Sequence, residues 1–260
     1  MKAKKSYGQH FLTNEDYAQR IADGLLLTDR YDKVLEVGPG RGMLTKYLLE
    51  KPFTTYAVDA DADMIEYMRH NYPMMSERLV KANFLRTDFK ELLGTEEFGL
   101  IGNFPYNISS QIVFKMIENK EQIPEMVGMF QREMAERIIA SPGGKDYGII
   151  AVLTQAYYEG EMLFNVKPGN FNPPPKVQSA VIRLTRRENQ DLGCSYKMFR
   201  RVVKQAFSQR RKMLRNTMKS LMPKSPLLQD EFFNQRPERL SLEDFVQVTR
   251  WAEAFAEKHK

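Results

Sequence analysis

The sequence of 260 residues contains one cysteine, Cys194, and three histidines, His10, His70 and His259. A single cysteine excludes an internal disulfide, and scattered histidines give no metal-ligand spacing. No apolar run approaches the roughly 18 residues that a membrane-spanning helix needs, and no signal-peptide pattern follows the basic N-terminus. These absences predict a cytoplasmic protein that has no membrane segment and no structural metal.

Acidic residues are absent from one stretch of the chain, residues 197–219. This stretch carries nine basic residues. Because the formal net charge is +6, the rest of the chain is net acidic, at +6 − 9 = −3. A block of one sign indicates binding to a polyanion, and nucleic acid is favoured over a membrane. The alternative is a solvated helix face.

Short β-rich runs alternate with helical stretches from Tyr31 onwards. We expect strands at residues 33–37, 55–58, 79–83, 98–101, 126–129, 149–156 and 180–184. Such alternation predicts an α/β fold with a mainly parallel sheet and helices on both faces. Two late runs, separated by Pro168 and the three prolines at 173–175, favour a strand pair that closes the sheet antiparallel.

Strand signals end after Arg186. Beyond this point we expect two helices, at residues 195–221 and 241–258, the second capped by the sequence Ser-Leu-Glu-Asp that begins at Ser241. The chain is therefore expected to form a catalytic domain at 1–186 and a small all-helical domain at 187–260.

A glycine turn follows the first expected strand, with Gly38, Gly40 and Gly42 before a helical stretch. Such turns let the backbone approach a ligand at the carboxyl edge of a sheet. Met43 stands where a dinucleotide-binding turn needs a third small residue, which disfavours NAD. Asp59 ends the second strand, where a carboxylate can accept hydrogen bonds from ribose hydroxyls, although a capping or solvated Asp is equally compatible. The pattern predicts a ligand that carries an adenosine ribose.

The tetrapeptide Asn103-Phe104-Pro105-Tyr106 follows the fourth expected strand. The side-chain oxygen of Asn103 and the carbonyl of Pro105 can accept hydrogen bonds from an aminopurine amine and favour its attack on a methyl group. Turning a base out of the stack costs a few kcal/mol, and stacking returns about 1–3 kcal/mol per base. We expect Tyr106 to stack on one face of the base and Phe171 on the other. A core position is the alternative for Phe171.

These motifs resemble those of the ribosomal RNA adenine N6-dimethyltransferase family, over nearly the whole chain. The matching segments are residues 8–12, 38–42, 103–106, 131–137, 147–148 and 173–181. The resemblance implies a class I Rossmann-like methyltransferase fold with a seven-stranded, mostly parallel sheet. It also implies S-adenosyl-L-methionine as the cofactor and S-adenosylhomocysteine as the product.

Two further segments, residues 207–212 and 236–241, resemble the branch of the family that modifies small-subunit rRNA. This implies dimethylation of two adjacent adenosines in the 3′-terminal hairpin loop of 16S rRNA, with the immature small ribosomal subunit as partner and a role in its biogenesis. A monomer is the default expectation. The cofactor residues implied are Gln9, His10, Leu12, Glu36, Gly38, Gly40, Asp59, Ala60, Asn83, Phe84 and Asn103. The RNA-binding residues expected are Lys204, Arg210, Arg211, Lys212 and Arg215.

Three positions depart from the family pattern. His10 stands where Asn is usual, Asp59 where Glu is usual, and Asn83 where an Asp normally faces the cofactor adenine. Because Asn83 loses a charge-assisted hydrogen bond, we predict weaker cofactor binding than in a relative with Asp at this position.

Other functions remain open at this point. The antibiotic-resistance branch, which modifies 23S rRNA, shares the chemistry but is disfavoured by the long basic tail. An RNA-binding assembly factor without catalysis is compatible with the three departures. An NAD-dependent oxidoreductase is remote, because the glycine spacing does not fit and no proton-shuttling pair is evident.

Overall fold

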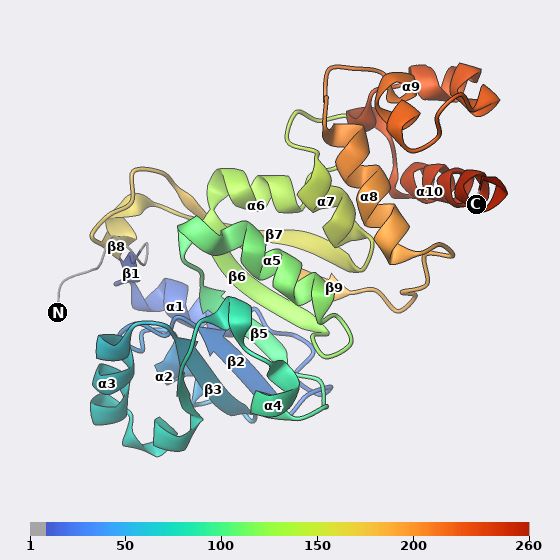
Figure 1. Cartoon of the computed structure of the whole chain (residues 1–260). Coiled ribbons are helices and arrows are strands. Elements are labelled where there is room, and N and C mark those ends of the chain that lie inside the picture. Colours follow the sequence, from blue (N-terminus) through green and yellow to red (C-terminus); the bar gives the residue numbers. More distant parts are fainter. Residues whose placement is uncertain (1–8, 260) are drawn as a thin grey trace. The chain divides into compact units, whose positions relative to one another are not determined.

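The computed structural model describes residues 9–259 and contains a seven-stranded mixed sheet flanked by helices (Figure 1). The strand order is β4-β3-β2-β5-β6-β9-β7. The strands are β2 (Lys33–Val37), β3 (Thr54–Asp59), β4 (Leu79–Lys81), β5 (Gly99–Asn103), β6 (Glu125–Gln131), β7 (Tyr158–Val166) and β9 (Ser179–Arg186). Residue 8 of the expected 8–12 motif lies outside the described residues. The predicted α/β fold is confirmed.

Strand pairing is parallel from β4 to β6 and changes at the end of the sheet. β2 pairs in parallel with β3 and β5, β3 with β4, and β5 with β6, whereas β9 runs antiparallel to β6. The two late strands are neighbours at this end, as the proline pattern predicts. All parallel strands therefore deliver their carboxyl ends to one edge, where ligands bind in open α/β sheets.

Residues 149–156 do not form the expected strand. They form helix α7 (Ile149–Gln155), and the strand begins at Tyr158. Four consecutive α7 residues, from Ala151 to Thr154, are buried, so the segment has apolar contacts on every side. An apolar run of this kind carries no period that separates a buried helix from a buried strand.

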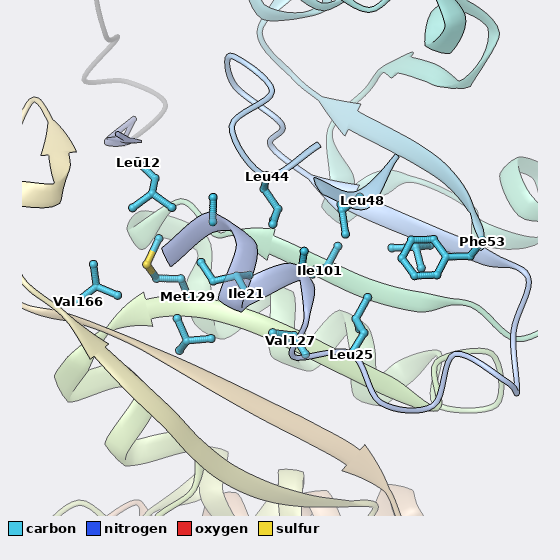
Figure 2. Packing of buried hydrophobic residues seen from close by; sticks show 14 of the residues in the cluster. Leu12, Ile21, Leu25, Leu44, Leu48, Phe53, Ile101, Val127, Met129 and Val166 are labelled. Atoms are coloured by element: carbon cyan, nitrogen blue, oxygen red, sulfur yellow. The ribbon is translucent and has the colours of Figure 1, made fainter. Parts of the chain in front are cut away.

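The other helices of the sheet region are short. They are α1 (Glu15–Ala22), α2 (Thr45–Leu48), α3 (Ala62–Asn71), α4 (Phe89–Leu93), α5 (Ser109–Glu118) and α6 (Arg132–Ile138). A core cluster packs α1 against the sheet, and Figure 2 shows Ile21 of α1 close to Ile101 of β5 and Met129 of β6. A small sheet of β1 (Phe11–Leu12) and β8 (Phe171–Asn172) joins this cluster through Leu12 and Phe171. The core thus holds two segments that lie far apart in the sequence, β1 and β8, beside α1.

The C-terminal part is helical, but the expected helix at 195–221 is interrupted. Helix α8 (Tyr196–Phe207) ends in a turn, and α9 (Leu214–Thr217) starts after Met213, whose backbone is extended (φ −66°, ψ 151°). Residues 208–213, between the buried Ala206 of α8 and the buried Leu214 of α9, are all exposed, so no apolar face supports a continuous helix across them. Helix α10 (Leu242–Lys258) forms as expected, and its Ser241 and Asp244 make a capping box.

The chain divides into two compact units. Among the described residues, one contains 9–135 and 159–186 and the other contains 136–158 and 187–259. The last boundary between the two units falls directly after Arg186, where strand signals end in the sequence. Residues 136–158 also belong to the second unit, because α7 packs on α8 and the Tyr147 hydroxyl donates a hydrogen bond to the Leu240 carbonyl at 2.9 Å.

Candidate functional site

A pocket opens at the carboxyl edge of the parallel strands. Its lining comes from the turns that follow β2, β3, β4 and β5, together with the segment around β1. Of the expected cofactor and target residues, those that line it are Gln9, His10, Gly38, Gly40, Asp59, Ala60, Asn83, Phe84, Asn103, Pro105 and Tyr106. The topology therefore brings together positions that lie up to 97 residues apart, from Gln9 to Tyr106.

The glycine turn after β2 requires glycine for its backbone conformation. Gly38, Gly40 and Gly42 have φ values of 69°, 54° and 79°, in the region that L side chains avoid. A Cβ atom on Gly42 would lie 2.4 Å from the Tyr72 ring, whereas one on Gly38 would meet nothing within 4 Å. Gly42 is thus needed for packing, and Gly38 leaves open space in the pocket wall for a ligand.

Asp59 is held at the pocket by backbone donors. The Asp61 N–H donates to Asp59 Oδ1 at 2.8 Å, and Asp61 in turn accepts from Gln9 Nε2 at 3.0 Å. Burial raises the pKa of Asp59 to about 6 despite these donors. The carboxylate is therefore fixed and partly desolvated, which suits an acceptor for two hydroxyl groups.

Glu36 lies in β2 behind the glycine turn and is not part of the pocket lining. Its side chain is 1% exposed and accepts a hydrogen bond from Thr45 Oγ1 at 2.6 Å. Burial raises the pKa of Glu36 to about 7, and the nearby Asp59 adds to the shift. Its expected contact with cofactor stays a prediction.

Asn83 caps a short 3₁₀ turn after β4 (Phe84–Arg86). The Leu85 N–H donates to Asn83 Oδ1 at 3.0 Å. The second polar atom of this amide, Nδ2, is a donor and cannot accept a hydrogen bond from an adenine amine. Only the remaining lone pair of Oδ1 is available for that purpose.

Asn103 ends β5 with its amide orientation fixed. Its Nδ2 donates to the His10 carbonyl at 2.9 Å. No described residue donates to Oδ1, and the side chain lines the pocket. A carboxamide whose donor end is engaged in this way presents its acceptor end to a ligand.

Pro105 follows with a carbonyl that is already engaged. Its oxygen accepts from the Ile108 N–H at 3.2 Å and shares the Ser109 hydroxyl proton, at 3.3 Å, with the Tyr106 carbonyl at 3.1 Å. A carbonyl oxygen has two lone pairs, so a substrate amine would compete with these bonds. The geometry thus supports the acceptor role of Asn103 more strongly than that of Pro105.

The ring of Tyr106 is held on one face and at its hydroxyl. It stacks on the His10 ring, with centroids 5.4 Å apart and an interplanar angle of 27°. The hydroxyl is 2.5 Å from Oγ of the buried Ser179, and His10 Nδ1 is 2.8 Å from the Pro173 carbonyl. Tyr106 is therefore preoriented by two segments distant in sequence.

Two further expected residues lie in the core and not in the pocket lining. Leu12 is 5% exposed and Phe171 is 4% exposed, and both belong to the cluster around α1. The core alternative for Phe171 describes its position in this structure, and its stacking role stays a prediction.

Pocket residues outside the expected set are Phe11, Val37, Val58, Ala82, Leu85, Phe104, Asn107 and Ile108. Most of them adjoin expected positions at strand ends, which is the signal that could have identified them.

The expected RNA-binding residues all belong to the second unit. Lys204 lies on α8, whereas Arg210, Arg211 and Lys212 occupy the turn after it and Arg215 lies in α9. Arg210 donates to the Gly144 carbonyl at 3.2 Å. Within the described part of the chain, none of these five side chains forms an ion pair. Their positive charge is thus available to a polyanion.

Two further classes of site are not found in residues 9–259. No helix there is long and apolar enough to cross a membrane. Over the same residues, no group of three or more His, Cys, Asp or Glu side chains could hold a metal ion.

Known proteins resemble this chain over nearly its full length. The family model described as Ribosomal RNA adenine dimethylase matches residues 1–253. A protein named Ribosomal RNA small subunit methyltransferase A from Flavobacterium johnsoniae is 50% identical over 254 residues, covering 98% of this chain and 97% of its own. A protein of the same name from Bacteroides thetaiotaomicron is 49% identical over 256 residues, covering 97% and 95%.

Solved structures agree with the fold. A dimethyladenosine transferase from Plasmodium falciparum has a TM-score of 0.78 at 24% identity, over 95% of this chain and 98% of that chain. The 23S rRNA methyltransferase ErmE has a TM-score of 0.69 at 23% identity, over 94% and 99%. The chain thus has a Rossmann-like methyltransferase fold, and the fold by itself does not distinguish a small-subunit from a large-subunit substrate.

Proposed function

Because the chain belongs to the ribosomal RNA adenine dimethylase family, we propose that it dimethylates N6 of two adjacent adenosines in the 3′-terminal hairpin loop of 16S rRNA. The cofactor is S-adenosyl-L-methionine, and S-adenosylhomocysteine is released. The substrate is the immature small ribosomal subunit. The small-subunit assignment is supported by the names of relatives that are 50% and 49% identical. The protein acts in the cytoplasm as a monomer.

The observation that carries this proposal is the orientation of Asn103. The residue lines the pocket and its donor end is bound to the His10 carbonyl, which leaves its acceptor oxygen for a ligand. An adenine amine has a lone pair delocalised into the ring, and attack on a methyl group requires a more tetrahedral nitrogen. An acceptor aimed at an amine hydrogen favours that geometry, and positioning of the reactants contributes the rest.

The residues of the pocket fit the cofactor. Open space at Gly38 admits a ligand against the backbone, Asp59 offers a fixed acceptor to the ribose hydroxyls, and Asn83 in the same pocket offers its amide oxygen to the adenine amine. When bound, S-adenosyl-L-methionine supplies an electrophilic methyl group on a sulfonium. Methylation of N6 breaks the sulfur–carbon bond and leaves a cationic, strongly acidic nitrogen that loses its proton to solvent water, so the protein needs no dedicated general base.

Tyr106 prepares a surface for the target base. The base must leave its stack, and aromatic stacking returns about 1–3 kcal/mol of that cost. Because His10 and Ser179 already hold the Tyr106 ring, little side-chain entropy is lost when the base stacks on its other face. Phosphate contacts from Lys204, Arg210, Arg211, Lys212 and Arg215 position the RNA, while the pocket selects the base.

The test is transfer of labelled methyl groups to small ribosomal subunits that lack the modification, with large subunits in parallel. We expect label on adenosines of small-subunit RNA only. Asn103→Ala should lower transfer by about two orders of magnitude, with cofactor binding and the melting temperature measured to exclude misfolding. Asn234→Ala, an exposed position outside the pocket, is the matched control.

Each other outcome identifies a different function. Label on the large subunit would assign the protein to the resistance branch. No label on either particle, despite tight binding to the small subunit, would favour an assembly factor without catalysis.

A further inference from the structure

A second concavity lies in the helical unit, separate from the cofactor pocket. Its lining includes Arg215, Lys219, Lys224, Ser225 and Gln229, and it contains no acidic residue. Three cations around one hollow are an unusual arrangement, because like charges repel one another. The sequence block at 197–219 contains Arg215 and Lys219, but Lys224 lies beyond its end.

The charges in this concavity are uncompensated. No described residue forms an ion pair or a side-chain hydrogen bond with Arg215, Lys219 or Lys224. The Nε atom of Arg215 is buried and lacks a hydrogen-bond partner. In the sheet unit, by contrast, Lys33 pairs with Glu96 at 3.4 Å and Arg186 pairs with Glu97. A buried donor without a partner carries a free-energy cost, which an anionic ligand would remove.

The backbone at Lys224 provides an independent observation. Its φ is 58°, and among residues 9–259 it is the one non-glycine residue in the left-handed region. Pro223 and Pro226 stand on either side of the turn, so its conformation is restricted. Glycine would adopt this conformation without strain. A lysine is therefore present at some cost to the fold, as is common at ligand-binding sites.

We propose that this concavity binds phosphate groups of the RNA backbone. Guanidinium and ammonium groups are the side chains that recognise phosphate, through charge-assisted hydrogen bonds. The Gln229 amide adds a neutral donor. The inference rests on the proposed function, since the phosphates are those of the rRNA substrate. It adds a concave contact to the basic turn at 210–212.

The test uses the full-length Lys224→Gly variant and unmodified small ribosomal subunits. Because glycine relieves the backbone strain, the melting temperature should stay equal or rise. Subunit affinity at about 0.15 M salt should fall roughly 5-fold, and the slope of log K against log salt should decrease by about 1. Lys258→Gln, which removes an exposed lysine of the same unit outside the concavity, should leave both quantities unchanged.

A second measurement needs no substitution. Modification of the wild-type protein with an amine-reactive reagent should be slowed at Lys219 and Lys224 when subunits are bound, while Lys258 reacts at its usual rate. The inference would be overturned if Lys224→Gly kept the affinity and salt slope of the wild-type protein. It would also be overturned if Lys219 and Lys224 reacted at their usual rate in an active complex. Either result would leave the proposed function intact. If the wild-type protein neither binds nor methylates small subunits, the proposed function fails and the inference fails with it.

Discussion

At position 83 the amide oxygen already accepts a hydrogen bond from the Leu85 N–H, at 3.0 Å. In Asn83→Asp, one carboxylate oxygen can keep this cap while the other accepts from the adenine amine. Hydrogen bonds to charged groups exceed neutral ones by about 1 kcal/mol, so we expect affinity for S-adenosyl-L-methionine to rise roughly 5-fold. Titration calorimetry measures the change.

Asn234→Asp adds the same charge at an exposed position and serves as the control. An unchanged or lower cofactor affinity in Asn83→Asp would show that this position does not limit binding.

The raised pKa of Asp59, about 6, predicts a pH dependence of cofactor binding. Ribose hydroxyls donate to the ionised carboxylate, so binding favours loss of its proton. Affinity should be full above about pH 7 and should fall with acidification, approaching tenfold per pH unit well below pH 6. Because the folded pKa lies above the ordinary value of 3.8, protonation of Asp59 favours the folded state, and unfolding does not explain the loss.

Dissociation constants measured from about pH 8 to about pH 5 test this dependence. Asp59→Asn should bind S-adenosyl-L-methionine more weakly and with a flatter pH profile. Glu36 is the second carboxyl group with a raised pKa, about 7, and the Glu36→Gln variant separates its contribution to the pH dependence. A wild-type affinity that does not change with pH would contradict the assignment of Asp59 to the ribose.

Sequence reasoning about the site was most informative for the polar residues at strand ends. It placed Asn103 and Asp59 at one edge, because parallel strands share their carboxyl ends. It did not foresee that the His10 carbonyl orients the Asn103 amide, or that the Pro105 carbonyl is occupied by Ile108 and Ser109. The Asn103 contact joins residues 93 positions apart and depends on packing that no local pattern encodes. The Pro105 contacts are local and belong to the turn that follows this residue.

Among the elements, α10 begins with a capping box whose two halves are both formed. The Asp244 N–H donates to Ser241 Oγ at 3.1 Å, and the Ser241 N–H donates to Asp244 Oδ2 at 2.9 Å. Ser241→Ala should lower the free energy of unfolding by about 1 kcal/mol. Urea denaturation of this variant, with Ser141→Ala at an exposed position as control, measures the loss. Equal midpoints for the two variants would mean that the cap adds no stability.

The sequence predicted an element correctly where its apolar residues recur with the period of a helix or a strand. Helix α10 has a cap and a repeating apolar face, and both are found. The segment at 149–155 has neither alternation nor an amphipathic face, so its composition favours a strand although the segment is buried as a helix. The helix expected to extend to residue 221 ends at Phe207, since residues 208–213 are all exposed and buried apolar positions resume only at Leu214.

At the scale of the whole molecule, the net positive charge lies in one unit, since residues 136–158 and 187–260 carry 18 basic and 11 acidic side chains. Replacing Arg211 and Lys212 with Gln should raise KM for small subunits much more than it lowers kcat, since phosphate contacts position the RNA. The salt dependence of binding should weaken by roughly 1.5 in log slope. The control is a double variant of two exposed lysines outside the basic block, Lys167→Gln and Lys258→Gln. An unchanged slope would remove this turn from the RNA interface.

The order β6-β9-β7 delays the pairing of these strands during synthesis of the chain. Strand β7 is synthesised before β9, yet β9 lies between β7 and β6 in the finished sheet. Until Arg186 has left the ribosome, the six buried residues of β6 have no neighbour on that side, and β7 has no strand to pair with. Unpaired apolar edges recruit other chains. A nascent chain that stalls between residues 131 and 186 is therefore the form of this protein most prone to aggregate.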